Sequence, residues 1–596
     1  MSGVAVSLRS QTSTLTDLFR KRVSSLRKRG EYLKPLRTVN PEEAKRFSLS
    51  FLGKGTHRAA GIDGSMDFDE VLELLVFYVC ASGYSTRFDV EDDRVSFNLD
   101  GVLRIPGLAM SAAVPLWEED LSNLIEMADS ESDPDLRRSR ERIPFALMTM
   151  AELSLALEII KTGEYKLLFL DRPLSGTFPA LNRDASTLLA RGNSSLVGLK
   201  TEAGPVSSAD IYIAVGLGSG AGWVPSRGAN LTYAAIKGLI DRGKLTREDL
   251  GRTLNLGASD LEGLCNRLVN LDKRLQGGLL QKSGKGLFML KPDLSDYWTR
   301  VVDASLQVVS KIFRDSKHPL VDERGRWLTV LDLNAVNLFL THYLADEATR
   351  RGVLIIGIAK DTSATDYTRA VLPFFLSKQK EGVSSKPPDI KSDKAFLTIL
   401  SAVNSEAVST PWRTPAYDSC FTTLMWHPED EPPLRPARKI VSREQMYIRS
   451  YFQLRSFSAD PSVRSPVFLY DRLFMPERDT QISEFEVFER GKRTGLRPFV
   501  ESEQLSSVDN LILYLLSLSD NSEVMEAYGH NQLLYLADKY VKEEVEQMKG
   551  LLRGVIELEL TPLARREKVF TVARRFRDLR AASERARKRK ARQARG

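Results

Sequence analysis

Short apolar runs that end in a charged residue are the clearest pattern along the chain. Three of them stand out: residues 59–62 before Asp63, 167–170 before Asp171, and 353–359 before Lys360. Apolar runs of this length bounded by turn residues predict buried strands, and Gly64-Ser65 after Asp63 indicates a turn. Because ligands of open α/β sheets gather at the carboxyl ends of strands, we expect the three charged groups to share one active site, in which the carboxylates favour a metal.

The surrounding pattern predicts an α/β fold. Residues 1–50 have a helical period with a stop near Gly30, whereas 74–87 and 95–99 alternate like strands, and 117–162 is helical up to Gly163. The resulting order, three strands, a helix and the Asp171 strand, is that of an RNase H-like core with a mixed sheet. Further on, 296–350 is helical, 446–457 and 466–474 resemble strands, 375–395 and 425–440 resemble exposed loops, and a long C-terminal helix starts near Gln532.

Residues 205–295 resemble a winged-helix-like insertion. Helices are expected over 231–241, from Thr246 and from Ser259, and a hairpin with a basic tip over 278–290. Such a module commonly binds DNA, although a protein-contact domain of the same shape fits equally well. We therefore divide the chain into a basic helical segment (1–50), an RNase H-like core in two parts (51–204 and 296–563), the insertion (205–295) and a basic tail (564–596).

One glycine-rich motif matches a nucleotide-binding fingerprint without the helix that such a site requires. Residues 216–221 fit a dinucleotide-binding fingerprint and follow a strand-like run at 211–215. That fingerprint requires a helix to open at once, whereas Gly222, Trp223 and Pro225 follow here. A loop is the better interpretation.

Composition places the chain among soluble proteins of two to four domains, since it has 596 residues, of which 42% are hydrophobic and 27% charged. The longest uncharged stretches, 74–86 and 211–226, are too short to span a bilayer, and no signal peptide is evident. Cys80, Cys265 and Cys420 are isolated from one another, which favours a reducing compartment. We expect a cytoplasmic protein that is not embedded in a membrane.

The net charge of +7 is unevenly distributed. Residues 1–39 carry +7 and residues 564–596 carry +11, so the body between them is acidic at −11. Basic ends of this kind favour a polyanion or an acidic partner protein. A solubilising tail is the alternative interpretation of 585–595.

Two carboxylates are the natural first ligands of a hard divalent cation, because Asp63 and Asp171 follow buried-looking strands in matching contexts. Taken alone, an aspartate before glycine is usually a turn former. A third carboxylate is expected from the helix before Asp171. Glu152 is preferred and Glu158 is the fallback, since six residues separate them by about 240° around a helix and both cannot face the sheet.

Lys360 could hold a scissile phosphate, although a lysine at a strand end often only reaches solvent. The five histidines show no ligand spacing, so a zinc hydrolase is disfavoured. The sequence has no P-loop motif, so we do not expect the chain to hydrolyse ATP itself.

Four short motifs, in order, resemble those of the NurA nuclease family. The first three are Ile62-Asp63-Gly64-Ser65, Leu170-Asp171-Arg172-Pro173-Leu174 and Ile356-Gly357-Ile358-Ala359-Lys360; the fourth is Leu534-Tyr535-Leu536-Ala537-Asp538. The sequence departs from the family pattern in two places: Arg172-Pro173 replaces the usual Gly-Ser, and Asn531 replaces a usual proline. The stretch between Asp171 and Lys360 is also longer than the minimal family pattern, and the insertion accounts for this.

The resemblance implies an RNase H-like fold and 5′–3′ DNA nuclease activity that depends on Mn²⁺ (or Mg²⁺). It also implies a homodimer and partnership with a HerA-type hexameric ATPase translocase. By match, Asp63, Glu152 and Asp171 would hold the metal, Lys360 would meet the phosphate, and Asp538 would complete the site. The alternative is a non-catalytic NurA-like adaptor that binds DNA or a motor, which the Arg172-Pro173 departure favours.

Overall fold

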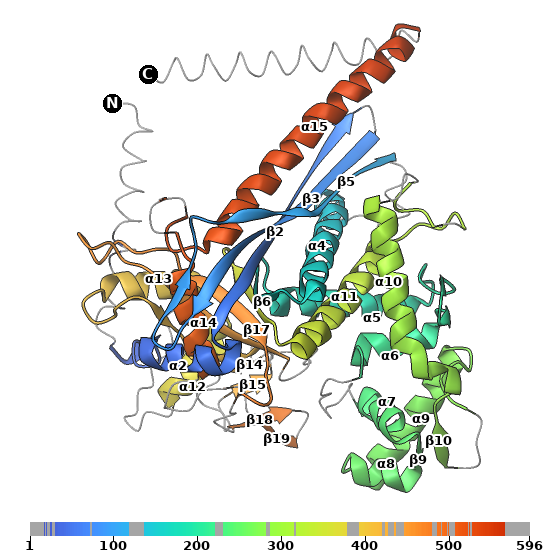
Figure 1. Ribbon diagram of the computed structural model, residues 1–596. Coiled ribbons are helices and arrows are strands. Elements are labelled where there is room, and N and C mark those ends of the chain that lie inside the picture. The colour runs from blue at the N-terminus through green and yellow to red at the C-terminus, as the bar shows by residue number, and fades with distance from the viewer. Residues whose placement is uncertain are drawn as a thin grey trace, which may run out of the picture.

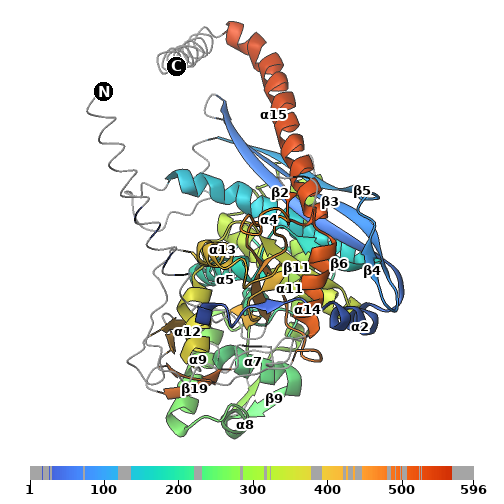
Figure 2. The same ribbon diagram turned by 90° about the vertical axis from the view of Figure 1, so that its left-hand side faces the viewer.

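The fold is seen in a computed structural model of the chain (Figures 1 and 2). The structure describes Asp17, Arg20, Ser24 and Leu26 and most of residues 30–566. Within the latter range it leaves out short gaps, the stretches 118–135, 221–230 and 378–391, and much of 420–445 and 480–506. Most of the predicted N-terminal helix and the whole tail from residue 567 lie outside the described residues, as do most of the two predicted loops at 375–395 and 425–440.

An 11-stranded mixed sheet forms the centre. Three antiparallel strands come first in the chain: β2 (Gly55–Val71), β3 (Leu74–Val90) and β5 (Leu103–Trp117). On the other side of β2, β6 (Tyr165–Leu170) runs parallel to it, and β11 (Leu354–Ala359) runs parallel to β6. The spatial order β5-β3-β2-β6-β11, with a helix between β5 and β6, is RNase H-like, as the sequence predicts. The third long strand is β5, however, whereas the predicted third strand at 95–99 forms only the short β4 (Val95–Phe97) beside β3.

The second half of the chain extends this sheet. Next to β11 lie β17 (Phe468–Leu473) and β16 (Tyr447–Gln453), both antiparallel to their neighbours, as the strand pattern at 446–474 predicts. The remaining strands of this sheet are short: β1 (Arg37–Thr38), β4 (Val95–Phe97), β12 (Trp412–Arg413) and β13 (Tyr417–Asp418). Separate two-stranded pairs join β7 (Lys200–Thr201) to β8 (Gly204–Pro205), β14 (Leu424–Trp426) to β15 (Leu434–Pro436), and β18 (Phe485–Glu489) to β19 (Lys492–Leu496).

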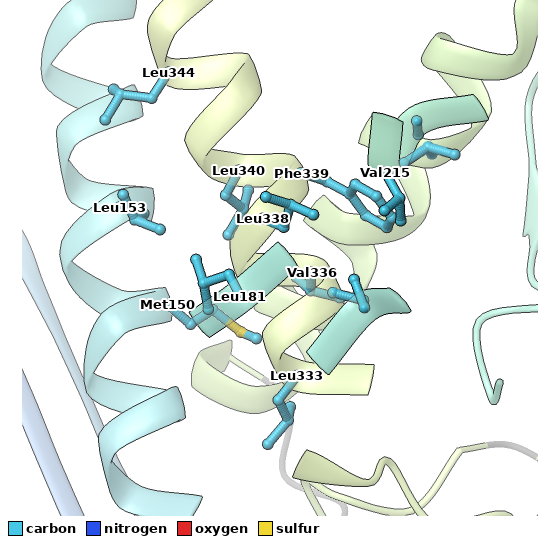
Figure 3. Packing of buried hydrophobic residues seen from close by; sticks show 14 of the residues in the cluster. Met150, Leu153, Leu181, Val215, Leu333, Val336, Leu338, Phe339, Leu340 and Leu344 are labelled. Atoms are coloured by element: carbon cyan, nitrogen blue, oxygen red, sulfur yellow. The ribbon is translucent and has the colours of Figure 1, made fainter. Parts of the chain in front are cut away.

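Helices cover both faces of the sheet. On one face α4 (Leu136–Thr162) packs against β2 and β3, and α11 (Val330–Arg351) packs against α4. Figure 3 shows α11 between α4 and the helices α5 (Leu174–Arg191) and α6 (Ser208–Leu217), with Leu153, Leu340 and Val215 at their contacts. Against the other face lie α2 (Pro41–Leu52), α14 (Ser507–Leu518) and α15 (Gln532–Arg566), and α15 follows β2 and β3 along their length (Figure 1). The other helices are α10 (Tyr297–Arg314), α12 (Leu372–Ser377), α13 (Asp393–Val403) and the short turns at Gly30–Tyr32, Pro292–Asp296 and Tyr367–Val371.

The predicted turn after Asp63 is wrong. The strand β2 continues to Val71, and Gly64 and Ser65 pair with Ala81 and Cys80 of β3. Glycine is needed at residue 64 because of close packing, since a Cβ there would lie 2.4 Å from Glu152 Oε1 and 2.8 Å from Met148 Cγ of α4. A glycine inside a strand often marks such a close approach rather than a turn.

Two further expectations need correction. Residues 211–215 form the middle of helix α6 and not a strand, because Ser207 and Asp210 make a capping box that starts a helix there. The helix expected over 117–162 does not include Trp117, which is the last residue of β5. Although the 141–162 part of α4 is apolar enough to span a membrane, 83% of its most apolar window is buried within the fold.

The insertion has the element order of a winged helix. Helix α7 (Leu231–Arg242) is followed by β9 (Lys244–Thr246), α8 (Arg247–Thr253) and α9 (Ala258–Arg274). The strand β10 (Leu287–Met289) pairs with β9 as its antiparallel neighbour, and Leu280 bridges to Leu290. These elements form a group to one side of the main sheet (Figure 1), and their role as a separate domain stays a prediction.

Candidate metal centre

The parallel pairing of β2 and β6 brings the first two predicted carboxylates together. Ile62 lies opposite Leu170, so the next residues along both strands are Asp63 and Asp171. The backbone N–H of Asp171 donates to the carbonyl oxygen of Ile62 at 3.1 Å, which extends the register by one step. The strand order therefore places both aspartates at one point of the sheet, as the sequence predicts.

The third carboxylate is that of Asp538 on α15, which is far in the sequence from Asp63 and Asp171. The side-chain oxygen of Asn531 accepts hydrogen bonds from the N–H groups of Leu533 and Leu534 at 3.1 and 3.2 Å, so Asn531 caps the helix that carries Asp538. One oxygen from each of Asp63, Asp171 and Asp538 lies within 4.8 Å of the others. We call these three residues the carboxylate cluster.

Asp63 is the most confined member of the cluster, with 5% of its surface exposed. Its Oδ1 accepts a hydrogen bond from the Gly64 N–H at 2.7 Å, whereas its buried Oδ2 has no hydrogen-bond partner in the described part of the chain. Burial, and after it the negative charges of Asp171 and Glu152, raise the pKa of Asp63 well above its ordinary value. A divalent cation would satisfy the unpaired oxygen and favour the ionised form, so these oxygen ligands fit Mn²⁺ or Mg²⁺.

Lys360 joins the cluster from the neighbouring strand. It directly follows β11, and its Nζ lies 2.5 Å from Asp171 Oδ2. Burial alone would lower the pKa of Lys360, but the carboxylates of Asp171, Asp63 and Asp538 raise it above its ordinary value. The ammonium group therefore stays charged and 30% exposed beside the cluster, where it can meet an anion.

The two candidates for a further carboxylate lie outside this cluster. Glu152 is buried and bonded to the Arg172 guanidinium, whose Cζ also lies 5.1 Å from the centre of the Phe145 ring. Glu158, the fallback, pairs with Arg314 at 2.7 Å and is 38% exposed. The role of Glu152 as a metal ligand therefore stays a prediction.

The turn after Asp171 is held by buried polar contacts. Pro173 precedes α5, and the Asp471 carboxylate accepts hydrogen bonds from the Leu174 and Ser175 N–H groups at 3.2 and 2.6 Å. The start of this helix is thus occupied by a carboxylate of the protein itself. Arg172-Pro173, the departure from the family pattern, forms an ordered turn here.

The carboxylate cluster faces a cleft of about 780 Å³. Besides the cluster, the cleft is lined by four lysines and by aromatic side chains: Lys360, Lys394, Lys539, Lys542, Phe468, Tyr528, His530 and Tyr535. Except for Lys360, none of these is predicted as a site residue from the sequence. Spacing was an available signal for two of them, because Tyr535 and Lys542 fall three residues before and four residues after Asp538 on one helix and so share its face.

The fold and this site define an RNase H-like protein with a three-carboxylate centre in a lysine-lined cleft. No family model and no curated protein matches the sequence. Among solved structures, the chain is similar to the NurA nuclease from Sulfolobus solfataricus, with 12% identity and a TM-score of 0.38 over 94% of this chain and 98% of that chain.

Two further NurA structures are also similar. The structure with manganese has 12% identity and a TM-score of 0.33 over 92% of this chain and 98% of that chain. The structure bound to dAMP and manganese has 10% identity and a TM-score of 0.34 over 89% and 93%. The assignment of the fold rests on the strand order and register.

His530 provides a prediction about pH. It is 7% exposed and lines the cleft, and burial, assisted by the charge of Lys360, lowers its pKa to about 4. Unfolded histidine takes up a proton near pH 6.5, whereas native His530 stays neutral to about pH 4, so the unfolded state binds more protons between these values. We expect the free energy of unfolding to fall as the pH is lowered from 6.5 to 4, and urea unfolding at several pH values measures this. In H530Q the fall should be smaller; an identical pH dependence in both proteins would contradict the assignment.

Gly61 provides a second prediction, because a Cβ there would lie 2.7 Å from Leu533 Cβ and 3.1 Å from the Leu533 carbonyl carbon. Alanine at residue 61 must displace the start of α15 and hence Asp538. We expect G61A to lower the free energy of unfolding by about 1–3 kcal/mol and to weaken Mn²⁺ binding, as measured by thermal unfolding and metal titration. The matched control is G83A, whose Cβ would meet the flexible tips of Ile105 at 3.3 Å and Ile159 at 3.5 Å and no backbone atom closer than the Gly61 carbonyl oxygen at 3.7 Å. Equal effects of both substitutions would refute this account of Gly61.

Proposed function

We propose that this protein is a metal-dependent deoxyribonuclease. The supporting observation is the carboxylate cluster, which brings Asp63, Asp171 and Asp538 together. The buried Oδ2 of Asp63 has no hydrogen-bond partner among the described residues. Manganese (or magnesium) and DNA are taken from the motif resemblance to NurA. A bound divalent ion polarises a phosphoryl oxygen and lowers the pKa of bound water, which is what phosphodiester hydrolysis requires.

The residues of the chain have separate parts in this proposal. Asp63, Asp171 and Asp538 hold the cation, and Lys360 places a positive charge where the scissile phosphate carries its negative charge. The other cleft lysines, at 394, 539 and 542, are suited to neighbouring phosphates of the same strand. The aromatic groups of Tyr528 and Tyr535 offer surfaces on which bases can stack.

The wider biology of the proposal also follows from the resemblance. We propose a NurA-like 5′–3′ exonuclease that resects DNA ends, acts in the cytoplasm as a homodimer, and works with a HerA-type hexameric ATPase. A winged-helix insertion and basic chain ends provide further candidate DNA or partner contacts outside the cleft. Co-purification with a HerA-type ATPase and light scattering of the purified chain examine partnership and dimer formation.

The test is cleavage of linear DNA labelled at either end, by the full-length chain with Mn²⁺, Mg²⁺ or EDTA. Mononucleotides released first from the 5′ end only when metal is present are the expected result. A chain that binds DNA but does not cut it with either metal, alone or with the ATPase, would instead support the non-catalytic adaptor. The observation that favours this second candidate is the hydrogen bond from Arg172 to Glu152, because it occupies a carboxylate that the motif resemblance assigns to the metal.

A further inference from the structure

Glu152 lies next to the carboxylate cluster but outside its cleft. Its Oε2 accepts a hydrogen bond from Arg172 Nε, and both side chains are 6% exposed. Among the described residues that line the cleft, Gly64 is the neighbour of Glu152, with only 2.4 Å between Glu152 Oε1 and the position of a Cβ on residue 64. Glu152 is therefore close enough to influence the site, as its contribution to the raised pKa of Asp63 indicates.

Arg172 is a fixed internal cation at this position. It directly follows Asp171 in the chain, and its guanidinium packs over the Phe145 ring. Because it is bonded to Glu152 within the interior, the pair is neutral as a unit. A divalent cation could recruit Glu152 only by separating the pair and leaving the Arg172 charge buried.

The charge that remains in the cleft is too small for two divalent ions. Counted formally, the three carboxylates, with Lys360 bonded to Asp171 and Lys542 bonded to Asp538, carry a charge of −1. Two-metal phosphodiester sites hold their ions about 3.5–4 Å apart and need additional carboxylates to share between them. Besides Glu543, which lines the cleft, Glu152 is the acidic group packed against Gly64 of the cleft, and Arg172 already neutralises it.

We propose that Arg172 takes the place of a second metal ion: it holds Glu152 permanently and leaves a site that binds a single divalent cation. This inference rests on the proposed metal-dependent function of the carboxylate cluster. It assigns Arg172 and Glu152 as positioning residues that act through Asp63 and Asp171. In contrast, the motif resemblance assigns Glu152 to the metal itself.

The test counts Mn²⁺ ions bound to the full-length protein, using electron paramagnetic resonance to measure free Mn²⁺. We expect one ion per chain in the wild type. We also expect the double variant E152Q/R172M to change the Mn²⁺ dissociation constant by no more than about threefold, because no ligand is lost and neither charge of the buried pair is left without its partner. If Glu152 were a ligand, its loss would weaken binding by at least about 10–100-fold, the range known even for groups one step removed from a metal.

A second variant tests the role of Arg172 directly. R172M frees the Glu152 carboxylate, and we expect a second Mn²⁺ ion to bind, while the double variant E152Q/R172M should return to one. Two ions on the wild type, a single ion on R172M, or a large loss of Mn²⁺ affinity in the double variant would overturn the proposed role of Arg172. If the wild type binds no Mn²⁺, the proposed function fails and this inference fails with it. If the wild type binds two ions, only this inference fails, so the number of bound ions distinguishes the two results.

Discussion

Substitution of Asp171 by asparagine is expected to lower the rate of metal-dependent DNA cleavage about a thousandfold or more, because the metal supplies several kcal/mol of transition-state stabilisation and each 1.36 kcal/mol is a factor of ten. Asp171 contributes to the site in two ways. One of its oxygens is within 4.8 Å of ligand oxygens of Asp63 and Asp538, and Oδ2 lies 2.5 Å from Lys360 Nζ. Asparagine keeps the shape but loses the charge that both contacts require.

The rate is measured with end-labelled linear DNA at saturating Mn²⁺, beside a Mn²⁺ titration that should show weaker binding by D171N. E158Q is the matched control, since Glu158 pairs with Arg314 at the surface, outside the residues that line the cleft. Thermal unfolding of D171N should be close to that of the wild type or higher, because one of three mutually repelling carboxylates is neutralised. If D171N cleaves DNA at more than about one tenth of the wild-type rate, Asp171 is not a ligand of the catalytic metal, since the loss of transition-state stabilisation is then below about 1.4 kcal/mol.

The main features of this fold could be predicted because two of the strands that build the site, β6 and β11, are short apolar runs that end directly before a charged residue. The runs before Asp171 and Lys360 end as β6 and β11 do, at Leu170 and Ala359. The order of strands and helix then leaves the RNase H-like arrangement as the natural interpretation. The patterns after residue 445 and from Gln532 also correspond to observed elements, because they are long or strongly periodic.

The surroundings of Asp63 could not be predicted from local sequence. Gly61 and Gly64 resemble turn residues, yet each is a glycine because a helix from elsewhere packs on it: α15 through Leu533, and α4 through Glu152. Such contacts join segments that are 88 to 472 residues apart, and a single sequence gives no measure of them.

The residues that contact the charged groups of the site could not be predicted from the local sequence, for the same reason. His530 enters the cleft because Gly529 and the end of α14 turn the chain there, and Arg172 is paired by a carboxylate from the preceding helix. The sequence indicates that Arg172 departs from a pattern, but only the packing shows which group it neutralises. The candidate site was therefore predictable in Asp171 and Lys360, which follow the ends of their strands, and unpredictable in the strand position of Asp63 and in what surrounds these residues.

Substitution of Arg472 by methionine is expected to cause the largest loss of stability, about 3–5 kcal/mol in the free energy of unfolding, because it leaves two buried carboxylates without their cation. Arg472 lies on β17 and is 0% exposed, as are the side chains of Asp479 and Asp509. Its guanidinium donates to both oxygens of Asp479 at 2.7 Å and to Asp509 at 2.7 and 2.9 Å. The bonds tie the strand to α14 and to the chain after β17.

The pH dependence gives this prediction its specific signature. Burial would raise the pKa of Asp509, but Arg472 outweighs it and lowers that pKa to about 2. The stabilisation is therefore fully present above the unfolded pKa near 4 and is lost as the pH falls through about 2, so the difference between R472M and the wild type should be greatest near neutral pH and shrink below pH 4. Calorimetry should show a melting temperature lower by about 2–4 °C at pH 7, because the entropy of unfolding of a chain of this length is large. R314M, which removes an exposed partner of Glu158, should melt near the wild type. An R472M protein that melts within about 0.5 °C of the wild type would show that this buried network does not hold the fold together.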